Sequence, residues 1–96
     1  MSAKIEVRRL SGGEGGALRF GVEVSDGGGA KSYEVTMGLQ THKGAPFNAA
    51  DPVRCIEACF RFLLDREPKE SIMSRFDVTV IRRYFPEFDA KLEGYM

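Results

Sequence analysis

The stretch that decides the fold runs from Asp51 to Arg66 and reads DPVRCIEACFRFLLDR. Asp51 followed by Pro52 is a common opening of a helix, because aspartate accepts hydrogen bonds from the first free amides and proline fits the first helical position. Polar residues then recur at helical spacing. The sequence therefore predicts a main helix over these residues, with a polar stripe about 80° wide formed by Arg54, Glu57, Arg61 and Asp65.

The rest of this helix is apolar over an arc of about 240°, whereas a helix resting on one sheet needs an apolar stripe of only about 100°. The arc holds Cys55, Ile56, Ala58, Cys59, Phe60, Phe62, Leu63 and Leu64. Such a helix must be covered on two flanks. A sheet covers one flank, and the other is covered either by a later part of the chain or by a second copy related by a two-fold axis.

Upstream of this helix, three short runs alternate apolar and polar residues: residues 5–8, 18–24 and 33–37. Strict alternation is typical of an antiparallel sheet that is covered on one side. The glycine-rich links at 11–16 and 26–29 are short and lead into strand patterns rather than helices. We therefore expect hairpin tips rather than phosphate-binding loops, and a three-stranded antiparallel β-meander over about residues 3–39.

The remaining segments are less regular. Residues 40–50 break the alternation and predict a linker, with His42 in a solvated loop. Beyond the main helix, Pro68 opens a second short helix and Asp77 is placed to cap a third. Residues 78–81 are β-branched and would suit a fourth, edge strand, but apolar residues at helical spacing favour a helix over 77–85. These apolar residues are Ile81, Tyr84, Phe85 and Phe88.

Together these patterns predict an α+β fold and one domain over residues 1–96. The meander packs against the main helix, and two or three short C-terminal helices complete a helical part over residues 51–93. At 96 residues, the chain has the length of one small domain, since chains of this size rarely divide into two.

Composition and charge restrict the function. The 14 basic side chains balance the 14 acidic ones, which argues against gripping nucleic acid or anionic lipid through overall charge. No apolar run approaches the ~20 residues needed to cross a bilayer, and the N-terminal residues have no signal-peptide pattern. We therefore expect a cytoplasmic protein with no membrane partner.

The cysteines and the histidine give little ground for a metal or for catalysis. In a reducing cytosol, Cys55 and Cys59 are expected to be free thiols buried like small apolar residues. With His42 alone beside them, they do not complete the four ligands of a zinc site. No strained turn for a serine nucleophile and no enclosed pair of carboxylates can be inferred. We therefore expect no catalytic residues, no cofactor, no metal and no enzymatic activity.

Two binding functions are left. The first is a protein-interaction or regulatory module that contacts a protein partner, or a second copy in a homodimer, through the wide apolar face of the main helix. Phe60, Leu64 and Tyr84 are the candidate contact residues. An exposed edge of the meander offers another route, which is strand pairing between chains.

The alternative is a nucleic-acid-binding module. Its candidate residues are Lys69, Arg75, Arg82 and Arg83, which lie close in sequence to Phe76, Tyr84 and Phe85. Arginine beside stacking aromatic rings suits single-stranded nucleic acid. However, acidic residues slightly outnumber basic ones in residues 46–96, so this half builds no basic field, and a solvated charged face explains the same residues.

The segment EACFRFLLDREPKESI at 57–72, with RYFPEF at 83–88 and more loosely YEVT at 33–36, resembles a family of small uncharacterised bacterial proteins. The similarity covers the C-terminal half of the chain. The resemblance implies a bacterial cytosolic setting, and it transfers no activity, cofactor, ligand or site residue to this sequence.

Overall fold

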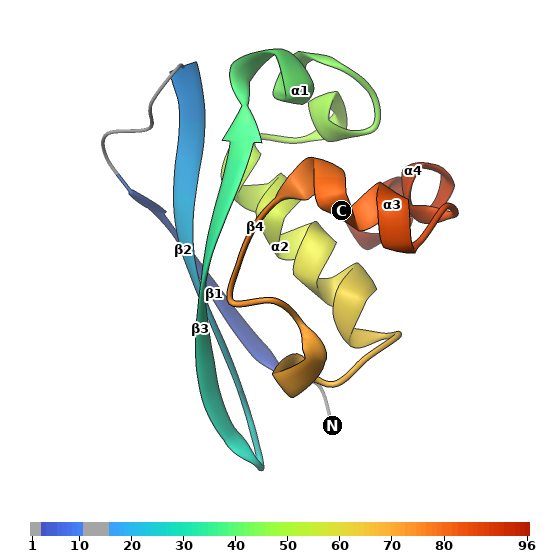
Figure 1. Ribbon diagram of the computed structural model, residues 1–96. Helices are drawn as coiled ribbons and strands as arrows, with labels where there is room; N and C mark the ends of the chain where they lie inside the picture. The colour runs from blue at the N-terminus through green and yellow to red at the C-terminus, as the bar shows by residue number, and fades with distance from the viewer. Residues whose placement is uncertain (1–2, 11–15) are drawn as a thin grey trace.

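The structure is a computed structural model that describes residues 3–10 and 16–96. It has an α+β fold in which a four-stranded sheet carries the helices on one face (Figure 1). The first three strands are antiparallel neighbours, and the fourth is parallel to the third. In sheet order the strands are β1 (Lys4–Leu10), β2 (Ala17–Asp26), β3 (Gly29–Gly38) and β4 (Arg75–Asp77).

The predicted three-stranded antiparallel meander is present as β1, β2 and β3, but the sheet is mixed and not purely antiparallel, because it has a fourth strand, β4, that was not predicted and is parallel to β3. β4 lies beside β3, with Arg75 opposite Glu34 and Asp77 opposite Thr36. Because parallel neighbours need a long crossover between them, the intervening residues 39–74 leave the sheet at the C-terminal end of β3 and run back before β4 begins in the same direction as β3. A strand of three residues offers too short an alternation to stand out in the sequence.

The glycine-rich link at 26–29 is a hairpin tip, as predicted. Asp26 pairs with Gly29 across the turn, and the Asp26 carboxylate accepts a hydrogen bond of 2.8 Å from the Gly28 amide. Gly29 has φ of +115°, a conformation that favours glycine. The other hairpin tip was predicted at 11–16, and residues 11–15 of that link lie outside the described residues.

The helical half follows the prediction in its order and departs from it in detail. The main helix begins at the capping residue Asp51, whose carboxylate accepts from the Arg54 amide at 3.0 Å. It ends at Leu64, slightly before the predicted end. The predicted linker at 40–50 contains an α-helix and a turn of 3₁₀ helix. The helices are α1 (Leu39–Lys43), α2 (Pro52–Leu64), α3 (Ile81–Tyr84) and α4 (Phe88–Lys91), and the 3₁₀ turns are η2 (Phe47–Ala49), η3 (Lys69–Ser71), η4 (Val78–Val80) and η5 (Leu92–Tyr95).

The prediction of a helix over 77–85 was correct from residue 78 onward, where η4 leads into α3. The alternative of a strand over 78–81 was wrong, although a strand does end immediately before it. The second short helix predicted after Pro68 is only the 3₁₀ turn η3.

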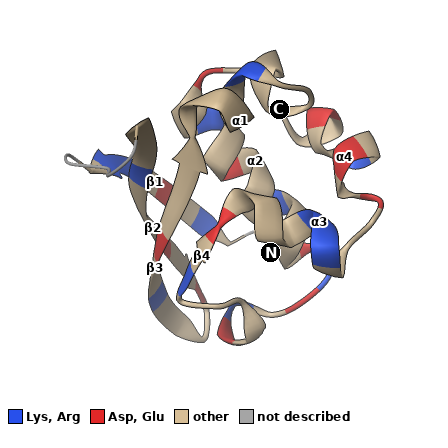
Figure 2. Cartoon of the chain, turned by 45° about the horizontal axis from the view of Figure 1, so that its top comes forward, with Lys and Arg blue, Asp and Glu red and all other residues tan. Residues whose placement is uncertain are grey.

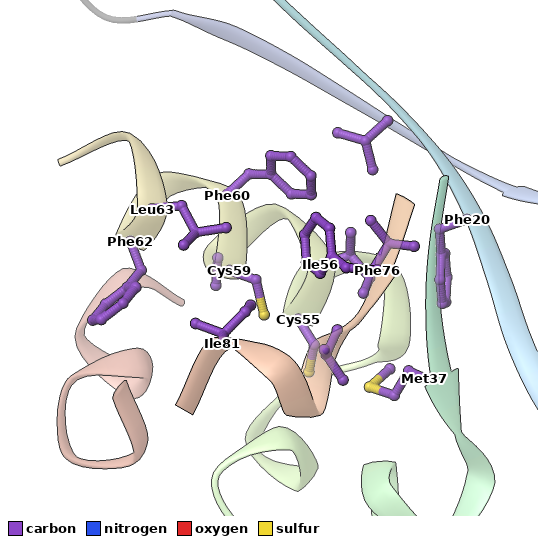
Figure 3. Close-up of a cluster of buried hydrophobic side chains, with 14 of the residues drawn as sticks. Phe20, Met37, Cys55, Ile56, Cys59, Phe60, Phe62, Leu63, Phe76 and Ile81 are labelled. Carbon is purple, nitrogen blue, oxygen red and sulfur yellow. The ribbon is translucent and has the colours of Figure 1, made fainter. Parts of the chain in front are cut away.

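The wide apolar arc of α2 is covered on both flanks by this chain itself. Phe60 points toward the sheet, where its ring centroid lies 5.0 Å from that of Tyr33. Phe62 points to the opposite flank (Figure 3) and meets the rings of Phe88 at 5.1 Å and Tyr95 at 5.8 Å. The helix therefore lies between the sheet and the C-terminal segment, and its apolar surface needs no second copy to cover it.

The sheet has one apolar and one polar face, as the alternation predicted. Phe20, Val24 and Val35 are fully buried beneath the helices, while on the outer face Arg19 pairs with Glu34 at 3.3 Å. Across residues 3–10 and 16–96, no helix is long and apolar enough to span a lipid bilayer.

Candidate functional site: an apolar groove beside α3

A groove of about 200 Å³ lies between the C-terminal part of α2 and residues 71–85. We call it the α3 groove. Its floor consists of core side chains that are almost completely buried: Leu63, Ile72, Phe76 and Ile81. Its walls carry more accessible apolar side chains: Met73, Val80, Tyr84 and Phe85.

One wall is held in place by hydrogen bonds from β3. Lys31 donates from Nζ to the Ile72 carbonyl at 2.7 Å, and the Tyr33 hydroxyl donates to the Lys69 carbonyl at 2.6 Å. The Glu34 amide donates to the Ser74 carbonyl at 2.8 Å. The segment that carries Met73 is therefore fastened to the sheet on both sides of that residue.

The opposite wall depends on Asp77, the predicted helix cap. Its Oδ2 accepts from the amide of Thr79 at 3.1 Å and from the hydroxyl of the same residue at 2.7 Å. Its Oδ1 accepts from the Thr36 hydroxyl at 2.7 Å. These bonds turn the chain sharply from β4 into η4, and the helix that follows presents Tyr84 at the groove.

The α3 groove gathers apolar side chains that the rest of the chain leaves uncovered. Met73 is 45% exposed and Tyr84 is 68% exposed, although both are large apolar residues. Both line the same hollow, together with the half-buried carboxylate-bearing side chain of Glu67. The α3 groove is therefore an apolar hollow with one carboxylate side chain in its lining.

The three predicted contact residues do not lie together. Phe60 is fully buried in the core, between the rings of Tyr33 and Phe76. Leu64 is half-buried in a separate hollow near the start of β1. Only Tyr84 belongs to the α3 groove. Met73, which also lines the groove, was missed because an apolar residue beside buried Ile72 carries no local sign that it faces solvent.

Of the four basic residues proposed for nucleic acid, Lys69 is not at the surface. It is 4% exposed, and its Nζ bonds to Asp26 at 2.7 Å and Glu70 at 2.8 Å. These two hydrogen bonds, chiefly the one that Lys69 donates to Asp26, raise the pKa of Lys69. The Lys69 amine is therefore buried and already bonded to two carboxylates of the same chain.

The three arginines of that set are accessible to different degrees. Arg75 extends into solvent and reaches Glu34 at 3.8 Å, and Arg82 pairs with Asp89 at 3.0 Å. Arg83 is exposed. Charges of both signs are interspersed along the described chain (Figure 2), so these arginines stand among acidic side chains.

Cys55 and Cys59 are buried free thiols, as predicted. The Cys55 thiol donates to the Phe47 carbonyl at 2.8 Å, and burial raises its pKa to about 11. Burial also raises the pKa of Cys59. Because the thiolate is the nucleophile and the metal ligand, neither thiol is activated.

His42 lies in α1, half-buried, rather than in the solvated loop that was predicted. Its Nε2–H donates to the Ala50 carbonyl at 2.8 Å, and the Cys55 thiol reaches the same oxygen at 3.3 Å. The imidazole and the thiol thus fasten α1 and α2 to one backbone group. Within the described residues, no group of three or more His, Cys, Asp and Glu side chains could hold a metal ion.

Comparison of the chain with models of protein families, with curated proteins and with solved structures finds no match. The resemblance to small bacterial proteins therefore stays a prediction.

Proposed function

We propose that this protein is a cytosolic protein-interaction module that binds an apolar side chain of a protein partner in the α3 groove. The observation that carries the proposal is the position of Met73 and Tyr84. These two large apolar side chains are well exposed and line the same hollow.

The size and lining of the groove support a side chain as the occupant. Sites for drug-sized ligands and cofactors usually occupy about 300–1,000 Å³, whereas this groove has about 200 Å³. Its floor is apolar, and Glu67 brings a carboxylate to its edge. A partner segment with an apolar anchor next to a lysine or arginine matches both features.

Binding to nucleic acid receives less support. It would rest on Arg75, Arg82 and Arg83 without Lys69, because the Lys69 amine is buried between two carboxylates. Two of these three arginines already pair with carboxylates, Arg75 with Glu34 and Arg82 with Asp89.

The test is selection of short peptides from a randomised display library, followed by affinity measurements on the selected peptides. We expect peptides that share one apolar anchor and a basic neighbour. Tyr84→Asp should weaken their binding by at least about tenfold, the equivalent of about 1.4 kcal/mol. Because Tyr84 is mostly exposed, the variant should keep the thermal unfolding of the wild type.

Two other exposed apolar residues supply matched controls, since Leu39 is 48% exposed and Val53 37% and neither lines the groove. Leu39→Asp and Val53→Asp should leave the affinity unchanged. Selected peptides that bind Tyr84→Asp as tightly as the wild type would contradict the proposal, as would a selection without any enriched apolar anchor.

A further inference from the structure

β1 is one edge of the sheet, at the opposite side from β4. It pairs with β2 through all seven of its residues, Lys4 to Leu10. Within the described chain, no strand pairs with its other side. An edge strand of this length presents a row of unpaired backbone amides and carbonyls, which can pair with a further strand.

The side chains of β1 differ between the two faces. Ile5 and Val7 lie on the inner face and are only half-buried, although their cross-strand neighbours Val24 and Val22 are buried. Glu6 and Arg8 lie on the outer face and are exposed. The edge thus offers two incompletely covered apolar side chains beside Arg9 on the inner face, and charges of alternating sign, from Lys4 to Glu6 to Arg8, on the outer face.

We propose that β1 pairs antiparallel with β1 of a second copy, about a two-fold axis at Val7, and joins the two sheets into one. This register places Val7 opposite Val7 on the inner face. On the outer face it places Glu6 opposite Arg8 of the second copy, and the symmetry makes this ion pair twice. Opposite charges in directly facing positions stabilise a strand pair, whereas like charges destabilise it.

The charges also exclude the neighbouring registers. Side chains alternate between the two faces of a strand. Only a shift of the pairing register by an even number of residues therefore keeps the apolar faces of the two β1 strands on the same side of the joined sheet. An axis at Glu6 sets Glu6 against Glu6 and Lys4 against Arg8, and an axis at Arg8 sets Arg8 against Arg8. An axis at Ile5 loses the pairing of the C-terminal half of β1. The register centred on Val7 uses the whole strand and opposes no like charges, with Arg9 opposite Ile5 on the inner face and Lys4 opposite Leu10 on the outer face.

Besides Arg9, which lies on the inner face opposite Phe20, this edge carries its charges on the outer face. Edge strands are commonly shielded by charges, especially lysines, that repel any added strand. Here the sign alternates along the outer face from Lys4 to Glu6 to Arg8, so an antiparallel copy meets complementary charges. The inference does not depend on the α3 groove, which lies beside the other edge of the sheet and shares no residue with β1.

The test measures the molar mass in solution, by light scattering after gel filtration, from micromolar to millimolar concentration. The wild type should dimerise. Glu6→Arg places arginine opposite arginine twice, and Arg8→Glu places glutamate opposite glutamate twice. Each single variant should therefore be monomeric, with at least tenfold weaker association, while thermal unfolding at low concentration stays close to that of the wild type.

Two combinations then test the register itself. An equimolar mixture of Glu6→Arg and Arg8→Glu chains should form a heterodimer, because each arginine again faces a glutamate. The double variant Glu6→Arg/Arg8→Glu should return to a homodimer. A wild type that stays monomeric at millimolar concentration overturns the proposal. A wild-type dimer that both single variants preserve, or that the mixture and the double variant fail to restore, overturns it as well.

Discussion

At the scale of single residues, Lys69 shows how a charged side chain can serve the fold rather than a ligand. Its amine is buried where the β2–β3 hairpin meets η3, bonded to Asp26 and Glu70. Its own carbonyl accepts from the Tyr33 hydroxyl. Lys69 therefore joins the hairpin tip, β3 and the segment that leads to the α3 groove.

This arrangement predicts a specific loss of stability in acid. The hydrogen bond from Lys69 is the main reason why the pKa values of Asp26 and Glu70 lie below their ordinary 3.8 and 4.5. A carboxyl group whose pKa is lowered in the folded state contributes its full stabilisation at pH values above its ordinary pKa. This contribution is lost as the pH falls through the lowered pKa. Lys69→Met removes this bond, so we expect its melting temperature to drop less than that of the wild type between pH 6 and pH 3.

The control for this pH series is Lys43→Met, since the Lys43 side chain is exposed. Its melting temperature should follow the wild type throughout. An acid-induced drop of the same size in Lys69→Met and in the wild type would show that the buried amine does not couple to the two carboxylates.

At the scale of elements, α2 is stabilised by contacts with the sheet on one side and with the C-terminal segment on the other. Phe62 makes contacts on the second side. It is fully buried, its ring meets Phe85, Phe88 and Tyr95 edge to face, and the Arg66 guanidinium lies 3.6 Å from its centroid. Replacing a buried phenylalanine by alanine costs about 3–5 kcal/mol. Phe62→Ala should lower the free energy of unfolding in urea by that amount.

Val53→Ala is the matched control on the same helix, because Val53 is partly exposed at 37%. Its effect should stay within about 0.5 kcal/mol, as is usual for surface positions. Equal effects of the two substitutions would mean that the C-terminal segment contributes nothing to the stability of α2.

The elements that could be predicted are those whose causes are local. Each of these patterns involves only residues that are close together in the sequence: the Asp51 cap, the helical period of α2, and the alternation of apolar and polar residues in β2 and β3. β4 is different, because its position beside β3 depends on contacts such as that between Thr36 and Asp77, which are 41 residues apart. No local pattern contains that pairing, so the fourth strand was missed.

The same distinction explains the candidate site. Tyr84 was one of the apolar residues at helical spacing near the C-terminus, while Met73, which lines the same groove, fell in the segment predicted as a second short helix. Phe60 and Leu64 share the apolar arc of α2, yet one is core and the other half-exposed. The sequence shows that the arc must be covered, and only the tertiary packing shows by what.

At the scale of the whole molecule, the chain forms three layers, which are the sheet, α2 and the C-terminal segment of α3, α4 and η5 (Figure 1). The third layer contributes Phe88 and Leu92 to the core, and both are fully buried. It is also tied to α2 by polar contacts. Arg66 bonds to Glu87 at 3.0 Å, and the Tyr95 hydroxyl donates to Asp65 at 2.7 Å.

Removal of residues 86–96 should therefore uncover the flank of α2 that carries Phe62, without touching the sheet. We expect the shortened chain to lose its cooperative thermal transition and to bind a hydrophobic dye such as ANS, as loosely packed states do. It should also self-associate through the uncovered helix. Because this contact does not involve β1, adding Glu6→Arg to the shortened chain should leave the association intact, whereas the same substitution should dissociate a dimer of the full chain. A shortened chain with sharp unfolding and no dye binding would instead mean that the sheet and α2 form a sufficient core by themselves.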